Sequence, residues 1–143
     1  MAIRLNPYLS FRDDAREAME HYRDIFGGEL TLSTFGEFQA SDDPAEKDKI
    51  MHAQLETPHG LVLMGADTPA TMPRQAGVND FSVSLSGDSE DLGTLRGWYD
   101  RLVEGGSVLE PLETAPWGDT FGMCVDRHGV TWLVNVAGGG APA

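Results

Sequence analysis

His52 is the side chain of this sequence best suited to acid–base chemistry. It lies in an alternating stretch, 49–56, on a face that we predict it shares with Ile50, Gln54 and Glu56. Because an imidazole changes its charge near neutral pH, His52 can serve as a general base or as a weak metal ligand. It can equally be a hydrogen-bonded strand histidine without a chemical role. Both interpretations stay open, and we take His52 as the tentative catalytic residue.

The other reactive side chains have simpler interpretations. His59 and His128 each precede a glycine between two alternating stretches, which is typical of hairpin turns, and His21 is expected on the surface of a helix. Cys124 has only Arg127 nearby to activate its thiol, so we predict a small residue in a cavity wall and not a nucleophile. As the single cysteine it excludes an intrachain disulfide and favours a reducing cytoplasm.

Polar and aromatic side chains on or beside the predicted strands form a second group of candidates. A cavity would explain Asn6, Tyr8 and Asn135, and exposure to solvent would explain them too. Trp117, which precedes Gly118, is either an aromatic lid over a ligand or a buried anchor for its loop. No glycine-rich phosphate loop, Ser-His-Asp order or cysteine pair supports nucleotide hydrolysis or a zinc finger.

The stretch 117–135 must position several of these candidates. Its alternation predicts two half-buried strands on either side of a turn at 126–129. We expect Trp132, with Val130 and Val134, to lie in the core. The opposite face is expected to line a cavity. We assign to this opposite face Gly122, Cys124, Thr131, Leu133 and Asn135.

The remaining elements are predicted to occur twice. Further strands are expected at 3–11, 29–38, 49–56, 61–66, 79–86 and 107–112. One helix follows a cap at Asp13 or Asp14, and a second follows caps at 86–89; each ends at a Gly-Gly pair, Gly27-Gly28 or Gly105-Gly106. Apolar residues recur at helical spacing in both and are expected in the core: Ala15, Ala18, Met19, Tyr22, Ile25 and Phe26 in the first, and Leu92, Leu95, Trp98, Tyr99, Leu102 and Val103 in the second. A polar loop is expected at 39–48.

This repeat predicts an α+β fold made of paired β-α-β-β-β modules. We expect them to form a curled, cup-shaped mixed sheet with the helices on its convex side, because one module alone would leave too much apolar sheet exposed. The whole chain, 1–143, is then one domain. We predict module 1 at about 1–67, a linker at about 68–77, module 2 at about 78–136 and a mobile tail at 137–143.

The composition excludes several classes of partner. The formal net charge of −13 repels a phosphate backbone, so nucleic acid is excluded as a partner. No apolar run approaches the roughly 20 residues that a membrane span requires, and the first residues lack the apolar core of a signal peptide. We therefore expect no membrane partner and a cytoplasmic location.

A set of short motifs occurs in a fixed order along nearly the whole chain: 6–11, Ala18 with Tyr22 and 26–28, 51–53, 63–67, Trp117-Gly118, Phe121-Gly122, and Asp126 with Gly129, Trp132 and Asn135. In this order the motifs resemble the vicinal oxygen chelate superfamily of glyoxalase, bleomycin-resistance and extradiol-dioxygenase proteins, and within it the PhnB-like branch. The resemblance implies a ligand-binding cup and a homodimer.

The same resemblance locates the metal ligands of the superfamily, usually His, His and Glu on the first, fifth and eighth strands. In this sequence those positions fall at Asn6 (or Pro7), near Asp80, and at Leu133. Leucine cannot bind a metal ion, and Asn6 offers only a weak oxygen ligand. We therefore predict no metal residues and no cofactor, and we disfavour a divalent metal.

The leading hypothesis is a PhnB-like protein that binds a small organic molecule in its cup without the usual metal triad. The alternative is a metal-dependent enzyme of glyoxalase or dioxygenase type with a displaced ligand set, His52 with Asp80 or Asp67. A third hypothesis is an interaction protein whose cup is filled by its own side chains. The predicted ligand-binding residues are Asn6, Tyr8, His52, Met64, Trp117, Cys124, Leu133 and Asn135.

Overall fold

The structure, a computed structural model, describes residues 4–37, 44–68 and 82–138 and divides the chain into two compact units. We call these units module 1 (Met1–Ala76) and module 2 (Gly77–Ala143) and describe each by itself. Several predicted features lie outside the described residues. These are the start of the first strand (Ile3), most of the polar loop (39–43), the linker from residue 69, Asp80 with the start of its strand, and the tail from residue 139.

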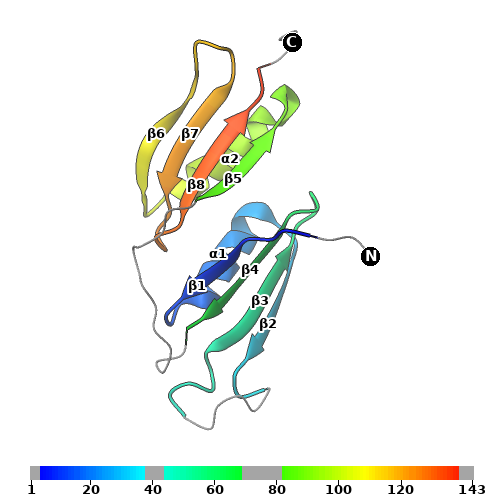
Figure 1. Ribbon diagram of the computed structural model, residues 1–143, viewed down its shortest axis with the longest axis vertical. Helices are drawn as coiled ribbons and strands as arrows, with labels where there is room; N and C mark the ends of the chain where they lie inside the picture. Colours follow the sequence, from blue (N-terminus) through cyan, green and yellow to red (C-terminus); the bar gives the residue numbers. More distant parts are fainter. Residues whose placement is uncertain (1–3, 38–43, 69–81, 139–143) are drawn as a thin grey trace. The chain divides into compact units, whose positions relative to one another are not determined.

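Module 1 is a four-stranded mixed sheet with one helix on one face (Figure 1). The strand order is β1-β4-β3-β2, in which β1 runs parallel to β4 and the other pairs are antiparallel. Its elements are β1 (Tyr8–Phe11), α1 (Ala15–Phe26), β2 (Glu29–Thr34), β3 (Ile50–Glu56) and β4 (Val62–Asp67). The predicted β-α-β-β-β order is confirmed.

Module 2 repeats this topology, with strand order β5-β8-β7-β6 and β5 parallel to β8. Between the last hairpins of the two modules, equivalent residues differ by 69 in number, as Met64 and Leu133 do. The predicted α+β fold of paired modules is confirmed. The elements are β5 (Val83–Gly87), the short 3-10 helix η1 (Ser89–Asp91), α2 (Leu92–Val103), β6 (Ser107–Thr114), β7 (Thr120–Val125) and β8 (Thr131–Val136).

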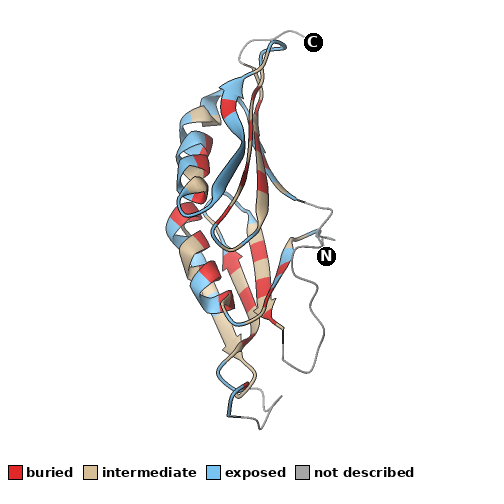
Figure 2. Ribbon diagram, turned by 90° about the vertical axis from the view of Figure 1, so that its left-hand side faces the viewer, coloured by how far each residue is buried: buried red, intermediate tan, exposed pale blue. Residues whose placement is uncertain are grey.

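Each helix covers one face of its own sheet, and the core of each module lies between them (Figure 2). All six apolar positions predicted for the first helix are buried in α1. In α2 the residues Leu95, Tyr99 and Leu102 are buried, whereas Leu92, Trp98 and Val103, predicted as core, are only half-buried. Burial of each large apolar side chain contributes about 1.5–3 kcal/mol, so apolar residues at helical spacing determine which face of each helix packs against the sheet. No helix in the described ranges is long and apolar enough to cross a bilayer.

Asp67 ties together three elements of module 1. Asp14 occupies the N-cap position of α1, as predicted, but its side chain makes no capping hydrogen bond. Instead the backbone N–H of Ala15 donates to Asp67 Oδ1 and that of Ile50 donates to Asp67 Oδ2, each at 2.9 Å. The carboxylate therefore joins the end of β4 to the starts of α1 and β3 and satisfies an otherwise unpaired N–H of the helix.

The four-residue hairpins that contain His59 and His128 are turns, as predicted. Gly60 and Gly129 adopt positive φ angles of 79° and 88°, which glycine tolerates best. In module 2 the turn is reinforced by Asp126, which is 3% exposed. Its Oδ1 accepts the backbone N–H of His128 at 2.8 Å, and its Oδ2 accepts the indole N–H of Trp132 at 2.8 Å.

Three predicted strand boundaries are wrong. β2 ends at Thr34, although the strand was predicted to continue to residue 38. β1 begins at Tyr8 and not at Ile3: Leu5 is 99% exposed, and the carbonyl of Pro7 accepts the N–H of Met64 before regular pairing starts. β6 continues to Thr114 through residues predicted as loop. Its Pro111 is tolerated because β6 pairs only with β7 and forms the sheet edge.

Candidate functional site

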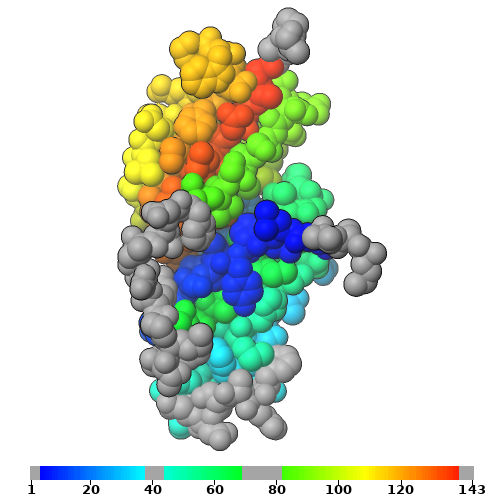
Figure 3. All heavy atoms as spheres, in the orientation of Figure 1, coloured from blue at the N-terminus to red at the C-terminus, as the bar shows by residue number. Residues whose placement is uncertain are grey.

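The face of each sheet that turns away from its helix, which we call the open face, carries most of the candidates (Figure 3). In module 1 the register places Tyr8 of β1 beside Met64 of β4, and Met64 beside Gln54 of β3. The neighbours of these residues along each strand are buried against α1, and Tyr8 itself is 49% exposed. Three predicted site residues, Tyr8, His52 and Met64, therefore share this open face.

Tyr8 and His52 contact each other across β4, the strand between their own. The Tyr8 hydroxyl lies 3.4 Å from His52 Nδ1, and the two ring centroids are 5.8 Å apart with the planes tilted by 37°. Partial burial raises the pKa of the Tyr8 hydroxyl, so it remains protonated and able to donate at neutral pH. The structure thus forms one ring pair from residues 44 positions apart in sequence.

The open face of module 2 is more apolar at the equivalent positions. Leu133 of β8 pairs with Ser84 of β5 and with Met123 of β7, and Asn135 pairs with Phe121. All of these except Ser84 are half-buried. The predicted open-face positions of Leu133 and Asn135 are confirmed. Phe121 and Met123 also lie on this face, whereas the assignment of Gly122 and Cys124 to it implied that they face the helix.

The assignment of Gly122 and Cys124 to the open face is wrong. Cys124 pairs with Trp132, and Gly122 pairs with Val134, so both lie on the helix side of the sheet. Cys124 is fully buried. The residue pairs could have been found by counting outward from the turn, because an antiparallel hairpin fixes every opposite pair.

Ile50 is also on the other face from the one predicted. A register shift beside Ser33 and Thr34 lies between His52 and Ile50, and Ile50 is buried with its N–H bonded to Asp67. One extra residue in a strand moves the following side chain to the opposite face. His52 therefore keeps only Gln54 and Glu56 of its predicted neighbours.

Burial should make the Cys124 thiol unreactive in the folded protein. Burial, reinforced by the charge of Asp126, raises the pKa of this thiol to about 11. We expect a disulfide reagent such as Ellman's reagent to label Cys124 at neutral pH only at the rate of unfolding, and to label it at once in urea. The intact protein's mass and the absorbance of the released thiolate report both rates, and rapid labelling without urea would contradict the expectation.

Trp117 and Asn6 lie at the margins of the modules. Trp117 is in the turn between β6 and β7, 71% exposed, beside Gly118 with a φ of 104°. Asn6 lines a surface pocket of about 630 Å³ together with Leu5, Glu56 and Leu61. Their role in ligand binding stays a prediction.

A metal site at the superfamily positions would need ligands on the open faces of the parallel strand pairs. Within the described residues these faces carry no carboxylate and no imidazole: they present Tyr8, Ser10, Val62, Met64 and Ala66 in module 1, and Ser84, Ser86, Thr131, Leu133 and Asn135 in module 2. Asp67 cannot join His52, because its side chain is buried on the helix side and both its oxygens are hydrogen-bonded.

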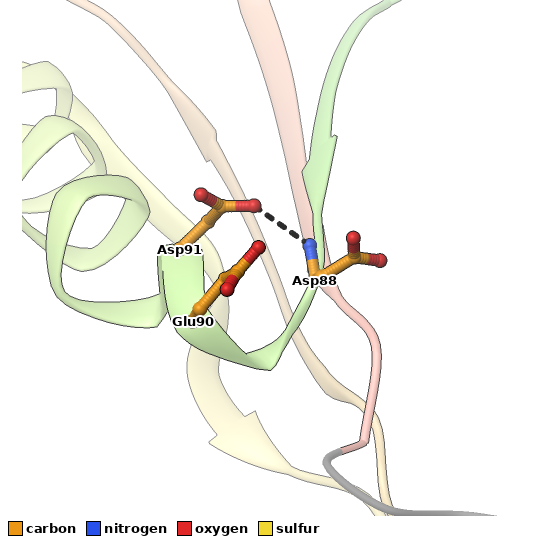
Figure 4. A group of neighbouring side chains, drawn as sticks. All are labelled: Asp88, Glu90 and Asp91. Carbon is orange, nitrogen blue, oxygen red and sulfur yellow. Dashed lines mark hydrogen bonds between the residues drawn. The ribbon is translucent and has the colours of Figure 1, made fainter.

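Asp88, Glu90 and Asp91 form the one group of three potential metal-binding side chains found in the described ranges (Figure 4). Asp91 Oδ2 accepts the backbone N–H of Asp88 at 2.9 Å, and the Asp88 side chain accepts in return a backbone N–H of η1. This reciprocal pair is a capping box. It accounts for the cluster as the cap of η1, which leads directly into α2.

The chain belongs to the Glyoxalase/Bleomycin resistance protein/Dioxygenase superfamily, whose family model matches residues 4–134. The duplicated β-α-β-β-β architecture agrees with this assignment, which the resemblance had predicted.

Several relatives cover almost the whole chain. The crystal structure of protein PA1353 from Pseudomonas aeruginosa is 38% identical, with a TM-score of 0.81, and the match covers 95% of this chain and 98% of that one. Protein YjdN of Escherichia coli is 28% identical, over 92% of this chain and 94% of its own. A Bacillus cereus PhnB protein, described as a putative 3-demethylubiquinone-9 3-methyltransferase, is 24% identical with a TM-score of 0.69, over 94% and 100% of the two chains, and supports the fold alone.

Proposed function

We propose that this protein binds a small organic molecule on the open faces of its sheets, the walls of the predicted cup, and does so without the metal triad. The observation that carries the proposal is the Tyr8–His52 pair, two polar rings in contact on a half-exposed sheet face beside Met64. Ligand pockets combine apolar surface with a few convergent polar groups, and this face has that composition.

Exposure distinguishes these residues from structural ones. The polar groups that serve the fold, such as Asp67 and Asp126, are almost fully buried and accept several hydrogen bonds. The Tyr8–His52 contact, in contrast, joins no loop or helix end and is long for a hydrogen bond. A function in binding explains why two polar rings occupy this position. No methyltransferase motif accompanies them, so we do not propose methyl transfer.

Thermal-shift screening against a library of metabolites tests the proposal. A ligand that binds only the folded state adds RT ln(1 + [L]/Kd) to its stability, so a true ligand raises the melting temperature with concentration. His52→Ala should abolish this shift, whereas His59→Ala, at the exposed hairpin, should keep it. If no compound stabilises the protein, or if His52→Ala responds as the parent does, the proposal is wrong.

Metal analysis separates the binder from the alternative, a metal-dependent enzyme that uses His52 with Asp80. We expect protein purified without chelator, then supplemented with Zn²⁺ or Mn²⁺ and desalted, to retain far less than one ion per chain. The reason is that Asn6 offers only a weak oxygen ligand, Leu133 offers none, and the described open faces of the parallel strand pairs carry no carboxylate or imidazole. Elemental analysis checks this, and one tightly held ion per chain, lost in His52→Ala, would favour the enzyme.

We further propose a cytoplasmic homodimer. The exposed Val108 (46%) and Leu109 (51%) on the edge strand β6 support self-association, because apolar side chains on an unpaired sheet edge favour pairing with another chain. The single thiol supports a reducing compartment.

A further inference from the structure

We propose that the open face of module 1 selects an uncharged ligand in which a hydrogen-bond donor stands beside an acceptor, such as a primary amide on an aromatic body, and that Tyr8 and His52 hold this group. The inference rests on the proposed binding function and specifies the chemical class of the ligand.

The Tyr8–His52 pair can present a donor and an acceptor together. A neutral imidazole carries one N–H and one lone pair. When Nδ1–H donates to the Tyr8 oxygen, the tyrosine O–H is free to donate to a ligand, and the Nε2 lone pair is free to accept. The contact of 3.4 Å is weak, so adopting this arrangement costs little. Among the residues that the structure describes, only Tyr8 hydrogen-bonds to the side chain of His52.

The electrostatic surroundings favour an uncharged ligand. The register neighbours of His52 are Ser33 on β2 and, along β3, Gln54; neither carries a charge. Among the described residues of that face, the nearest carboxylates are Glu56 and Glu29. Glu56 lies four residues from His52 along β3, roughly 13 Å away, and Glu29 is its register partner on β2. A cationic ligand at the ring pair would thus lack an adjacent carboxylate partner, and an anionic one would meet a chain of net charge −13.

The strand between the two rings supplies the apolar surface. Met64 pairs directly with Tyr8, while Ala66 follows two residues later on the same face, where a small side chain leaves room for the rings to meet. A flexible thioether adapts to a flat ring and makes favourable sulfur–aromatic contacts. The face therefore suits a polar head with an aromatic or aliphatic body.

Three related benzoyl compounds test the selection: benzamide, N,N-dimethylbenzamide and benzoate. Benzamide has both a donor and an acceptor, the dimethyl compound has lost its donors, and benzoate is an anion. Titrations followed by ¹H–¹⁵N NMR should show benzamide binding about tenfold more tightly than either of the others, since each lost hydrogen bond weakens binding several-fold. The shifts should be centred on β1, β3 and β4.

Conservative variants show whether the ring pair causes this preference. Tyr8→Phe and His52→Gln should bring the benzamide-to-dimethylbenzamide affinity ratio close to one, whereas His59→Gln should leave it unchanged. If Tyr8 and His52 had only a structural role, the substitutions would weaken the binding of both compounds alike and leave their affinity ratio unchanged. Equal binding of the three probes, an unchanged ratio in Tyr8→Phe, or no binding of benzamide up to about 10 mM would overturn the inference. Hits in the metabolite screen would then still support the proposed binding function. If the screen also gave no hit, both the binding function and the inference about the ligand class would be contradicted.

Discussion

Replacing Gly106 with alanine should destabilise module 2 by about 2–4 kcal/mol. A Cβ atom added to Gly106 would lie 2.0 Å from the Val125 carbonyl oxygen and 2.9 Å from backbone atoms of Asp126. These backbone atoms lie at the first residue pair of the β6–β7 ladder, so neither strand can move away without breaking that pair. Urea denaturation followed by circular dichroism measures the loss.

Gly97→Ala is the matched control. A Cβ at this exposed position in α2 would meet nothing within 4 Å, and alanine is a better helix former by about 0.8–1 kcal/mol. The same Gly→Ala change should therefore stabilise the protein at Gly97 and destabilise it at Gly106. Equal effects at the two positions would contradict the close approach of Gly106 to the backbone of Val125 and Asp126.

Asp67→Asn should cost module 1 about 2–4 kcal/mol of unfolding free energy. Both carboxylate oxygens of Asp67 accept backbone N–H groups, from Ala15 and from Ile50, and the side chain is only 5% exposed. An amide presents an NH₂ group to one of these two N–H donors, so it loses a bond and leaves a buried donor unpaired. Urea denaturation of the variant and of the parent gives the difference.

Asp13→Asn provides the comparison at the surface. Asp13 lies 2.8 Å from Lys49, but its side chain is 66% exposed, and exposed ion pairs contribute at most about 1 kcal/mol. We expect this variant to unfold within that range of the parent. If Asp67→Asn were equally mild, Asp67 would not be the residue that joins α1 to β3 and β4.

The helices and hairpins could be predicted from the sequence because their signals are local. Every apolar position of α1 follows the 3.6-residue period, and both hairpins are marked by His-Gly at the turn. The faces of the strands were harder. Phe121 and Met123 are larger and more apolar than Gly122 and Cys124, yet the small residues lie under α2, where space is limited. The room on the helix side of β7 is taken by its strand neighbours, Trp132 beside Cys124 and Leu112 beside Gly122.

The candidate site could be predicted only in part, because its contacts join distant segments. Tyr8, His52 and Met64 were chosen as polar or flexible residues on strands, but no sequence rule gives a contact across an intervening strand. The bulge beside His52 and the two backbone hydrogen bonds that Asp67 accepts could not be predicted from the sequence either. Each depends on which strands of the module pair and in which register. Cys124 was placed wrongly because alternation alone does not fix which strand positions are opposite each other.

The parallel pairing of the first strand with the last has a consequence for synthesis on the ribosome. β1 finds its partner only when β4 has been made, and β5 must wait for β8, so neither sheet can be completed strand by strand as the chain emerges. Pairing over such sequence separation is slow, because the loop must be closed before the contacts form. Until then one edge of β3 and the part of α1 that packs on β4 stay uncovered, so the nascent first module exposes apolar surface for as long as its last strand is missing.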